Sequence, residues 1–103
     1  MAPGLLESSY RACLVRQLES DGMLVSREVP IGITYKGLVV PTLYRADLIV
    51  EGMTLVELKS VEKLLPIHEA QTLTYLRHAH LSVGLLMNFN VKMLKDGIRR
   101  FVR

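Results

Sequence analysis

Charged residues lie within two apolar segments between Tyr44 and Lys59. The first segment contains Asp47, the second contains Glu57 and Lys59, and Gly52 lies between them. Both segments have the alternating pattern of β-strands, and a charge on the buried face of a strand is costly unless it is paired or bound to a metal ion. Packing alone does not account for these three charges, so this pair of strands is the first candidate site.

The length of the turn between the strands decides whether the two carboxylates meet. A three-residue turn over 51–53, with Gly52 in the left-handed conformation, places Asp47 opposite Glu57. A two-residue turn would place Asp47 opposite Val56 and send the two acids to opposite faces of the sheet. We expect the three-residue turn, or a bulge with the same effect.

Two carboxylates brought together in this way form an oxygen-rich site suited to Mg2+ or Mn2+. Lys59 lies two residues after Glu57 and therefore shares its face of the strand. An ammonium group at this position is suited to hold a phosphate oxygen or a nucleophilic water.

The first helix is expected from Pro3 to about Ser20, because Asp21 and Gly22 supply a stop signal. Its apolar stripe at helical spacing comprises Leu6, Tyr10, Cys13, Leu14 and Leu18. Glu7 lies at the edge of this stripe and has two interpretations, which the pattern does not separate. It is either an acid that stabilises the positive end of the helix, or an accessory ligand or base that reaches the acid pair.

Residues 24–31 are expected to form a strand, and residues 33–40 a short hairpin that turns at Lys36 and Gly37. A second helix from Ile67 to about Ala79 begins after Pro66, which suits a first helical turn. It places His68, Gln71 and Tyr75 on one face, and Leu73 and Leu76 are expected to contact the core.

Residues 81–89 form an almost unbroken apolar run, typical of a strand buried on both faces. A crossover through the second helix would return this strand to the sheet, and a short terminal strand over 98–102 follows. The order of helix, three or four strands, helix, strand and terminal strand predicts an α/β fold with a mixed central sheet flanked by helices.

The composition is that of one domain over residues 1–103, half of them hydrophobic, with a net charge of +3. The single cysteine, Cys13, excludes an internal disulfide and fits a reducing compartment. No apolar run approaches the ~20 residues that span a bilayer, and the N-terminus does not resemble a signal peptide. We therefore expect a cytoplasmic protein without a membrane partner.

Four stretches match a family pattern in order: residues 4–10 fit GxxExxY, Asp47 with residues 57–59 fits D…(D/E)xK, and residues 66–76 and 88–98 follow. Over essentially its whole length the chain resembles the GxxExxY proteins of the PD-(D/E)XK nuclease superfamily. Gln71 and Tyr75 further resemble the QxxxY motif of RecB-like nucleases.

The resemblance implies a restriction-endonuclease-like core and metal-dependent hydrolysis of phosphodiester bonds in a nucleic acid, with DNA favoured over RNA. The site residues that it implies are Glu7, Asp47, Glu57, Lys59, Gln71 and Tyr75. Asp47, Glu57 and the Leu58 carbonyl would hold Mg2+ or Mn2+. Lys59 would orient or help to deprotonate the attacking water, and Glu7 would complete the acidic cluster. Gln71 and Tyr75 would position the site or touch the nucleic-acid backbone.

The chain departs from the family pattern in two places. Arg45 and Ala46 stand where a proline often precedes the first acid. Relatives usually begin with a further helix before GxxExxY, so we expect a domain that is naturally short or that lacks this helix, with the exposed apolar surface covered by self-association.

The resemblance leaves a second function open. A non-catalytic nucleic-acid-binding or assembly module on the same fold would keep the acids as relics and would contact phosphates through Arg99, Arg100 and Arg103. Its binding would be sensitive to salt and would need no metal at Asp47 and Glu57.

Overall fold

The computed structural model describes residues 3–40, 44–91 and 93–103. Its elements in chain order are α1 (Pro3–Ser20), β1 (Val25–Pro30), β2 (Ile33–Tyr35), β3 (Leu38–Val40), β4 (Arg45–Val50), β5 (Thr54–Lys59), α2 (Pro66–His78), β6 (Val83–Asn88), the short 3-10 helix η1 (Leu94–Gly97) and β7 (Ile98–Val102). Both α-helices begin and end within one residue of the expected positions.

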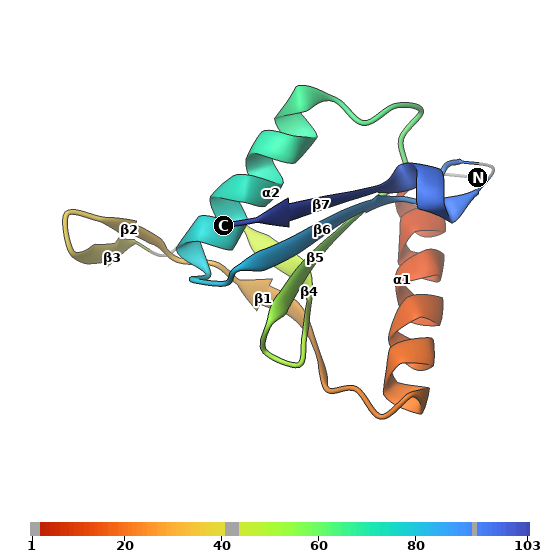
Figure 1. Ribbon diagram of the computed structural model, residues 1–103, viewed down its shortest axis with the longest axis horizontal. Helices are drawn as coiled ribbons and strands as arrows, with labels where there is room; N and C mark the ends of the chain where they lie inside the picture. Colours follow the sequence, from red (N-terminus) through yellow and green to blue (C-terminus); the bar gives the residue numbers. More distant parts are fainter. Residues whose placement is uncertain (1–2, 41–43, 92) are drawn as a thin grey trace.

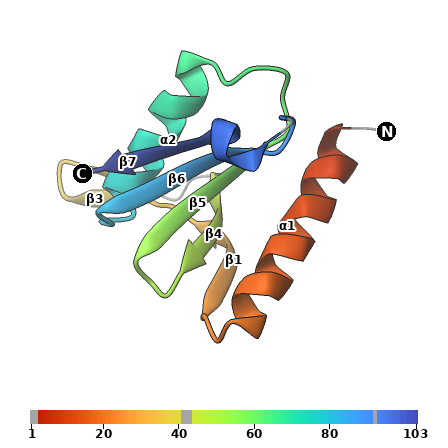
Figure 2. The same cartoon turned by 45° about the vertical axis from the view of Figure 1, so that its right-hand side comes forward.

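The central sheet has five strands in the order β1-β4-β5-β6-β7. β5 and β6 are parallel and are connected through α2, whereas the other neighbouring pairs are antiparallel. Figures 1 and 2 show the sheet between α1 on one side and α2 on the other. The prediction of an α/β fold with a mixed central sheet flanked by helices is confirmed.

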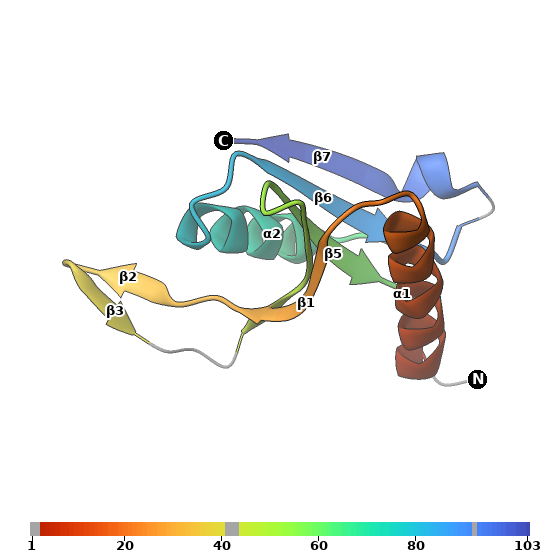
Figure 3. The same cartoon turned by 90° about the horizontal axis from the view of Figure 1, so that it is seen from below.

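Strands β2 and β3 form a separate two-stranded sheet that projects from the body of the molecule (Figures 1 and 3). The hairpin turns at Lys36 and Gly37, as expected, and both have positive φ angles, of 48° and 80°. Five strands therefore precede α2, where the sequence predicted three or four, because the hairpin strands pair with each other and stay outside the central sheet.

The turn between β4 and β5 is the expected three-residue turn, since Val50 pairs with Thr54. Gly52 has a φ of 65°, and Glu51 also has a positive φ, of 57°. Glu51 is held in this conformation by Leu24, whose carbonyl accepts its amide at 2.7 Å and whose amide donates to its side chain at 3.3 Å. The turn sets the register that brings Asp47 opposite Glu57.

The two faces of the sheet have separate cores. On the α1 side the buried residues are Val15, Leu48, Val56, Leu58 and Met87. On the α2 side they are Ile31, Ala46, Leu55 and Leu76. An added Cβ at Gly84 would lie 3.4 Å from the Leu76 side chain, an ordinary van der Waals contact, so α2 packs directly over this part of β6.

The helices confirm part of the expected core and correct the rest. Leu76 is fully buried, as predicted, but Leu73 is 40% exposed and Thr72 takes the inward position. In α1, Val15 is buried and Cys13 is exposed, because the stripe that faces the sheet is rotated away from the predicted one. Among the described residues, no helix is long and apolar enough to cross a bilayer.

The end of α1 follows the sequence prediction. Gly22 has a φ of 84°, and its amide donates to Glu19 while the Met23 amide donates to Leu18. These two bonds are those of a Schellman motif, in which a glycine ends the helix and satisfies its last carbonyls.

Candidate active site

A fork between β4 and β5 holds the two predicted acids. Backbone pairing between these strands runs from Val50–Thr54 to Leu48–Val56, and Asp47 and Glu57 are the next residues in that register. From here, β4 continues along β1 and β5 continues along β6. The strands separate at the position where the sequence placed the carboxylates.

The carboxylates take over the hydrogen bonding at the fork. The Asp47 amide donates to Glu57 Oε1 at 3.2 Å, and the Leu58 amide donates to Asp47 Oδ2 at 2.7 Å. Glu57 thus accepts the amide of Asp47, and Asp47 accepts the amide of the residue after Glu57. These two bonds satisfy backbone donors that the separation of the strands would otherwise leave without a partner. The structure brings Asp47 opposite Glu57, as the strand pattern predicted, whereas the part of Leu58 that contacts the pair is its amide and the role of its carbonyl stays a prediction.

Glu57 has a strongly altered acidity. It is 6% exposed, and burial together with the nearby charge of Asp47 raises its pKa to about 8. The Asp47 amide and the charge of Lys59 act in the opposite direction but are weaker. In the metal-free protein Glu57 is therefore largely protonated at neutral pH, and a cation at this position would favour its charged form instead.

Lys59 and Glu7 belong to the same cluster. The pKa of Glu7 is raised by partial burial and by Asp47, and is lowered by Lys59 and Arg11. Lys59 lowers the pKa of Glu57 as well, so its ammonium group lies near the acids of both β5 and α1. Of the two interpretations of Glu7, this placement favours the one in which its side chain reaches the acid pair.

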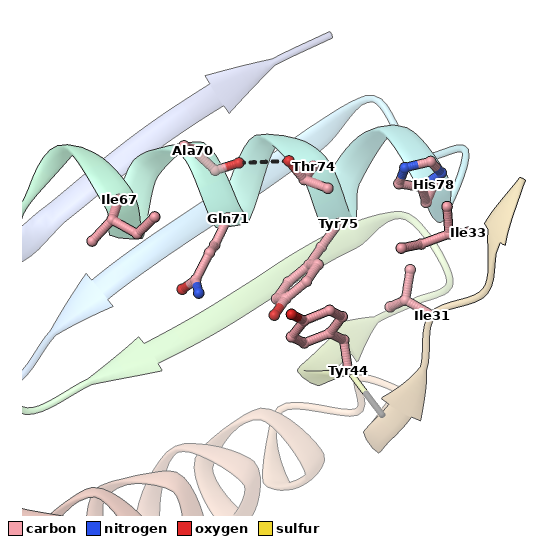
Figure 4. Close-up of a pocket in the computed structure, with 9 residues that line it drawn as sticks. All are labelled: Ile31, Ile33, Tyr44, Ile67, Ala70, Gln71, Thr74, Tyr75 and His78. Carbon is pink, nitrogen blue, oxygen red and sulfur yellow. Dashed lines mark hydrogen bonds between the residues drawn. The ribbon is translucent and has the colours of Figure 1, made fainter. Parts of the chain in front are cut away.

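Gln71 and Tyr75 line an apolar pocket on the α2 side of the sheet (Figure 4). Its volume is about 190 Å³, and its walls come from α2, from Ile31 and Ile33, and from Tyr44. Figure 4 shows the Gln71 amide and the hydroxyls of both tyrosines extending from the pocket toward the same side.

Tyr75 connects this pocket to the acid pair. Its pKa is raised by burial and then by the charges of Glu57, Tyr44 and Asp47. The rings of Tyr44 and Tyr75 lie 5.6 Å apart between centroids, tilted by 41°. His68, which the sequence placed on the same face, has a different role, because its Nδ1 accepts the Leu65 amide at the start of α2.

Three residues at the site were not found from the sequence. Arg11 Nη1 lies 3.8 Å from Asp47 Oδ1 and 3.5 Å from Glu28 Oε1. Arg11 follows Glu7 by four residues, so a helical-face argument could have included it. Glu28 and Tyr44 carry no comparable local signal, since their positions depend on strand pairing and on the packing of α2.

The family motifs around Tyr10 and Asn88 have structural roles near the site. The rings of Tyr10 and Phe89 stack with centroids 4.6 Å apart and an interplanar angle of 2°. The buried Asn88 side chain accepts the Val61 amide and donates to its carbonyl. The Phe89 amide donates to the Lys59 carbonyl, so both motifs brace the end of β5 that carries the catalytic candidates.

The donor set fits a hard divalent ion. Asp47 and Glu57 offer carboxylate oxygens, and Mg2+ is usually held by one or two carboxylates with water and phosphate completing its shell. Among the described residues, no three side chains of His, Cys, Asp or Glu are grouped so that they alone could hold a metal. A metal here would therefore depend on the Leu58 carbonyl, water and substrate for its remaining ligands.

Comparison with known proteins gives a family and a fold. A model of the PD-(D/E)XK nuclease superfamily matches residues 1–101. The crystal structure of an alkaline exonuclease (LHK-Exo) from Laribacter hongkongensis is similar, with a TM-score of 0.66 and 16% sequence identity. The similarity covers 100% of this chain and 59% of the exonuclease, so the chain spans less than two thirds of that protein. No curated protein matches the sequence. The narrower assignment to the GxxExxY proteins stays a prediction.

Proposed function

The chain belongs to the PD-(D/E)XK nuclease superfamily, and from this premise we propose that it hydrolyses phosphodiester bonds with the help of a divalent metal ion. The observation that carries the proposal is the acid pair in the fork between β4 and β5. A buried Glu57 facing a second, partly buried carboxylate is poorly explained by packing, because burying charges is costly.

Asp47, Glu57 and the Leu58 carbonyl would hold the metal, with Mg2+ or Mn2+ as the expected ion. When bound, such an ion lowers the pKa of a coordinated water and neutralises charge on the phosphate. Lys59 lies close enough to Glu57 and Glu7 for its charge to act on both, and it would orient the attacking water or hold a phosphate oxygen. Glu7 adds a third carboxylate from α1, where it would accept a proton from the water.

The pocket on the α2 side of the sheet is where the nucleic-acid strand would be positioned. Tyr75 and Gln71 extend from α2 on the side of Glu57, and Tyr44 adds a second ring. Aromatic rings of this kind stack on bases or pack on sugars, and an amide donates to phosphate oxygens. DNA is the expected substrate in preference to RNA.

The alternative of a non-catalytic binding module is less well supported. Arg99 and Arg100 are neighbours on β7 and so point to opposite faces of the sheet. Arg99 donates to the carbonyls of Asp96 and Ile98, and Arg103 donates to the carbonyl of Leu81. The three arginines therefore do not form one basic surface for phosphates.

The test is a cleavage assay on single- and double-stranded DNA and RNA with Mg2+, Mn2+ or EDTA. We expect divalent-dependent cleavage that falls at least about 100-fold in Glu57→Gln and in Lys59→Met, because each removes a group that acts on the metal or the water. Glu19→Gln and Lys95→Met are matched controls, since both residues are exposed and lie outside the site. Equal cleavage by the wild type and both site variants would reveal a contaminant. Salt-sensitive binding without cleavage would instead support the binding module.

A further inference from the structure

A cation already lies at the acid pair in the metal-free protein. The guanidinium of Arg11, from α1, is 3.8 Å from Asp47 Oδ1 and 3.5 Å from Glu28 Oε1, from β1. The side chains of Arg11 and Asp47 are only 29% and 19% exposed. Such a pair is less screened by water than a surface salt bridge, and its effect on the site is correspondingly larger.

Arg11 faces the oxygen of Asp47 that does not accept the Leu58 amide. Asp47 Oδ2 accepts the Leu58 amide at 2.7 Å, whereas Oδ1 is the atom next to the guanidinium. An arginine cannot release its charge by losing a proton. A divalent ion that binds Asp47 must therefore bind next to this charge or displace it.

Glu28, which contacts the same Arg11 side chain, has an unusual backbone conformation. Among the described residues, Glu28, Lys36, Glu51 and His80 are the non-glycine residues with positive φ, and the last three lie in turns. Glu28 has a φ of 47° within β1, between residues that pair with β4 on either side, and it lies opposite Asp47. A left-handed residue inside a strand is strained, and strain of this kind persists where the surroundings impose it, often at functional sites.

The Arg11–Glu28 contact is not needed simply to attach α1 to β1. A second ion pair, Arg27 to Glu19 at 3.4 Å, joins the same two elements at the far end of the helix. Both of its members are about half exposed and do not touch the acid pair. This second pair provides a comparison for tests of the first, because the residue types and the connected elements are the same.

We propose that Arg11 is the resident counter-ion of the acid pair, and that Glu28 receives its guanidinium when a divalent ion binds at Asp47. Arg11 and Glu28 are then positioning residues that set the affinity of the site for metal. The inference rests on the proposed function, since it assumes that Asp47 and Glu57 bind a metal. It adds that the Arg11 guanidinium sets the affinity of the site for metal. Without metal this group contacts both Asp47 and Glu28, and with metal it would contact Glu28 alone.

The experiment measures Mn2+ binding to the metal-free protein by isothermal titration calorimetry, without substrate. Arg11→Met keeps the apolar stem but removes the competing charge, so we expect about tenfold tighter binding. Glu28→Gln removes the receiving carboxylate, so the guanidinium stays on Asp47 and binding weakens several-fold. Arg27→Met, the matched control, should bind within about twofold of the wild type. Arg11→Lys keeps the charge and should stay near the wild type.

The double variant Arg11→Met with Glu28→Gln separates this mechanism from a general charge effect. If Glu28 acts by receiving Arg11, the double variant binds Mn2+ as tightly as Arg11→Met alone. Additive effects would overturn the inference, because Glu28 would then act on the metal directly or through the overall field. A crystal structure with Mn2+ in which Arg11 still contacts Asp47 would also overturn it.

Glu57→Gln distinguishes failure of the inference from failure of the proposed function. If Glu57→Gln abolishes Mn2+ binding but Arg11→Met leaves it unchanged, the metal site stands and the inference is wrong. If wild-type binding is absent or insensitive to Glu57→Gln, both proposals are wrong. Thermal unfolding in EDTA checks that each variant is folded before its affinity is compared.

Discussion

The acidity of Glu57 results from two effects that reinforce each other. Burial disfavours its charged form, and Asp47 adds a like charge in contact with it. The Asp47 amide and Lys59 favour the charged form but do not compensate. In the metal-free site Glu57 therefore holds its proton more tightly than an ordinary glutamate, and a cation bound at the pair would favour its charged form.

The raised pKa of Glu57 predicts how the stability of the protein depends on pH. The pKa of Glu57 is about 8 in the folded protein and near the ordinary glutamate value of 4.5 in the unfolded chain, so the folded state binds the proton more tightly. The free energy of unfolding should fall as pH rises between these values, by up to ~1.4 kcal/mol per pH unit. Urea unfolding in EDTA from pH 5 to 9 measures this slope.

Glu57→Gln is the control for this prediction, because its amide is neutral throughout. The variant should lose most of the slope and keep the part due to Glu7, whose pKa is also raised. If the free energy of unfolding changes with pH in the same way in the wild type and the variant, the pKa of Glu57 is not raised in the folded protein.

At the scale of elements, the position of α1 decides whether the site is complete. The helix carries Glu7 and Arg11 in its first half, and the Tyr10 ring stacks on Phe89, the residue that follows β6. The backbone bond from Phe89 to Lys59 continues this connection into β5. The tyrosine of the GxxExxY motif is thus explained by its ring, which ties the helix to the strand that bears Lys59.

This role predicts different effects for two substitutions of Tyr10. Tyr10→Phe keeps the stacked ring, so stability and divalent-dependent cleavage should stay within about twofold of the wild type. Tyr10→Ala removes a pair worth ~0.5–1.5 kcal/mol and loosens the half of α1 that carries Glu7. We expect about tenfold slower cleavage, measured alongside the free energy of unfolding. If Tyr10→Phe is as slow as Tyr10→Ala, the hydroxyl is the functional group and the stacking account is wrong.

At the scale of the whole molecule, the five-stranded sheet and its two helices carry the cores, and the β2–β3 hairpin extends beyond them (Figures 1 and 3). The hairpin exposes apolar side chains, including Leu38 at 66%. Leu48, in β4 next to the first acid, is fully buried in the α1-side core. The acid pair is thus adjacent to a fully buried residue of the core, whereas the hairpin is largely exposed.

A matched pair of substitutions tests whether the core beside the acid pair contributes more to stability than the hairpin does. Leu48→Ala should lower the free energy of unfolding by ~2–5 kcal/mol, because it leaves a cavity under the fork. Leu38→Ala makes the same chemical change at an exposed position and should cost less than ~0.5 kcal/mol. Denaturant unfolding of both variants gives the comparison. Similar losses would mean that the hairpin is packed against something in solution, such as a second copy of the chain.

The sequence by itself determined the features that depend on local chemistry. Gly22 ends α1 and Gly52 shapes the three-residue turn because few other residues adopt left-handed angles easily. The turn and the alternation of two then place Asp47 opposite Glu57, since strand register follows from both. The order of elements followed from the same periodicities.

Only the tertiary structure decided which of these residues meet residues distant in the sequence. The separation of β4 from β5, the burial of Glu57, and the contacts of Arg11 with Asp47 and Glu28 depend on strand order and on how α1 lies against the sheet. For the same reason Val15 is buried in place of Cys13, because a helical stripe of apolar residues does not specify its rotation to within one residue. Contacts between distant segments arise from the packing of whole elements, and no local pattern encodes them.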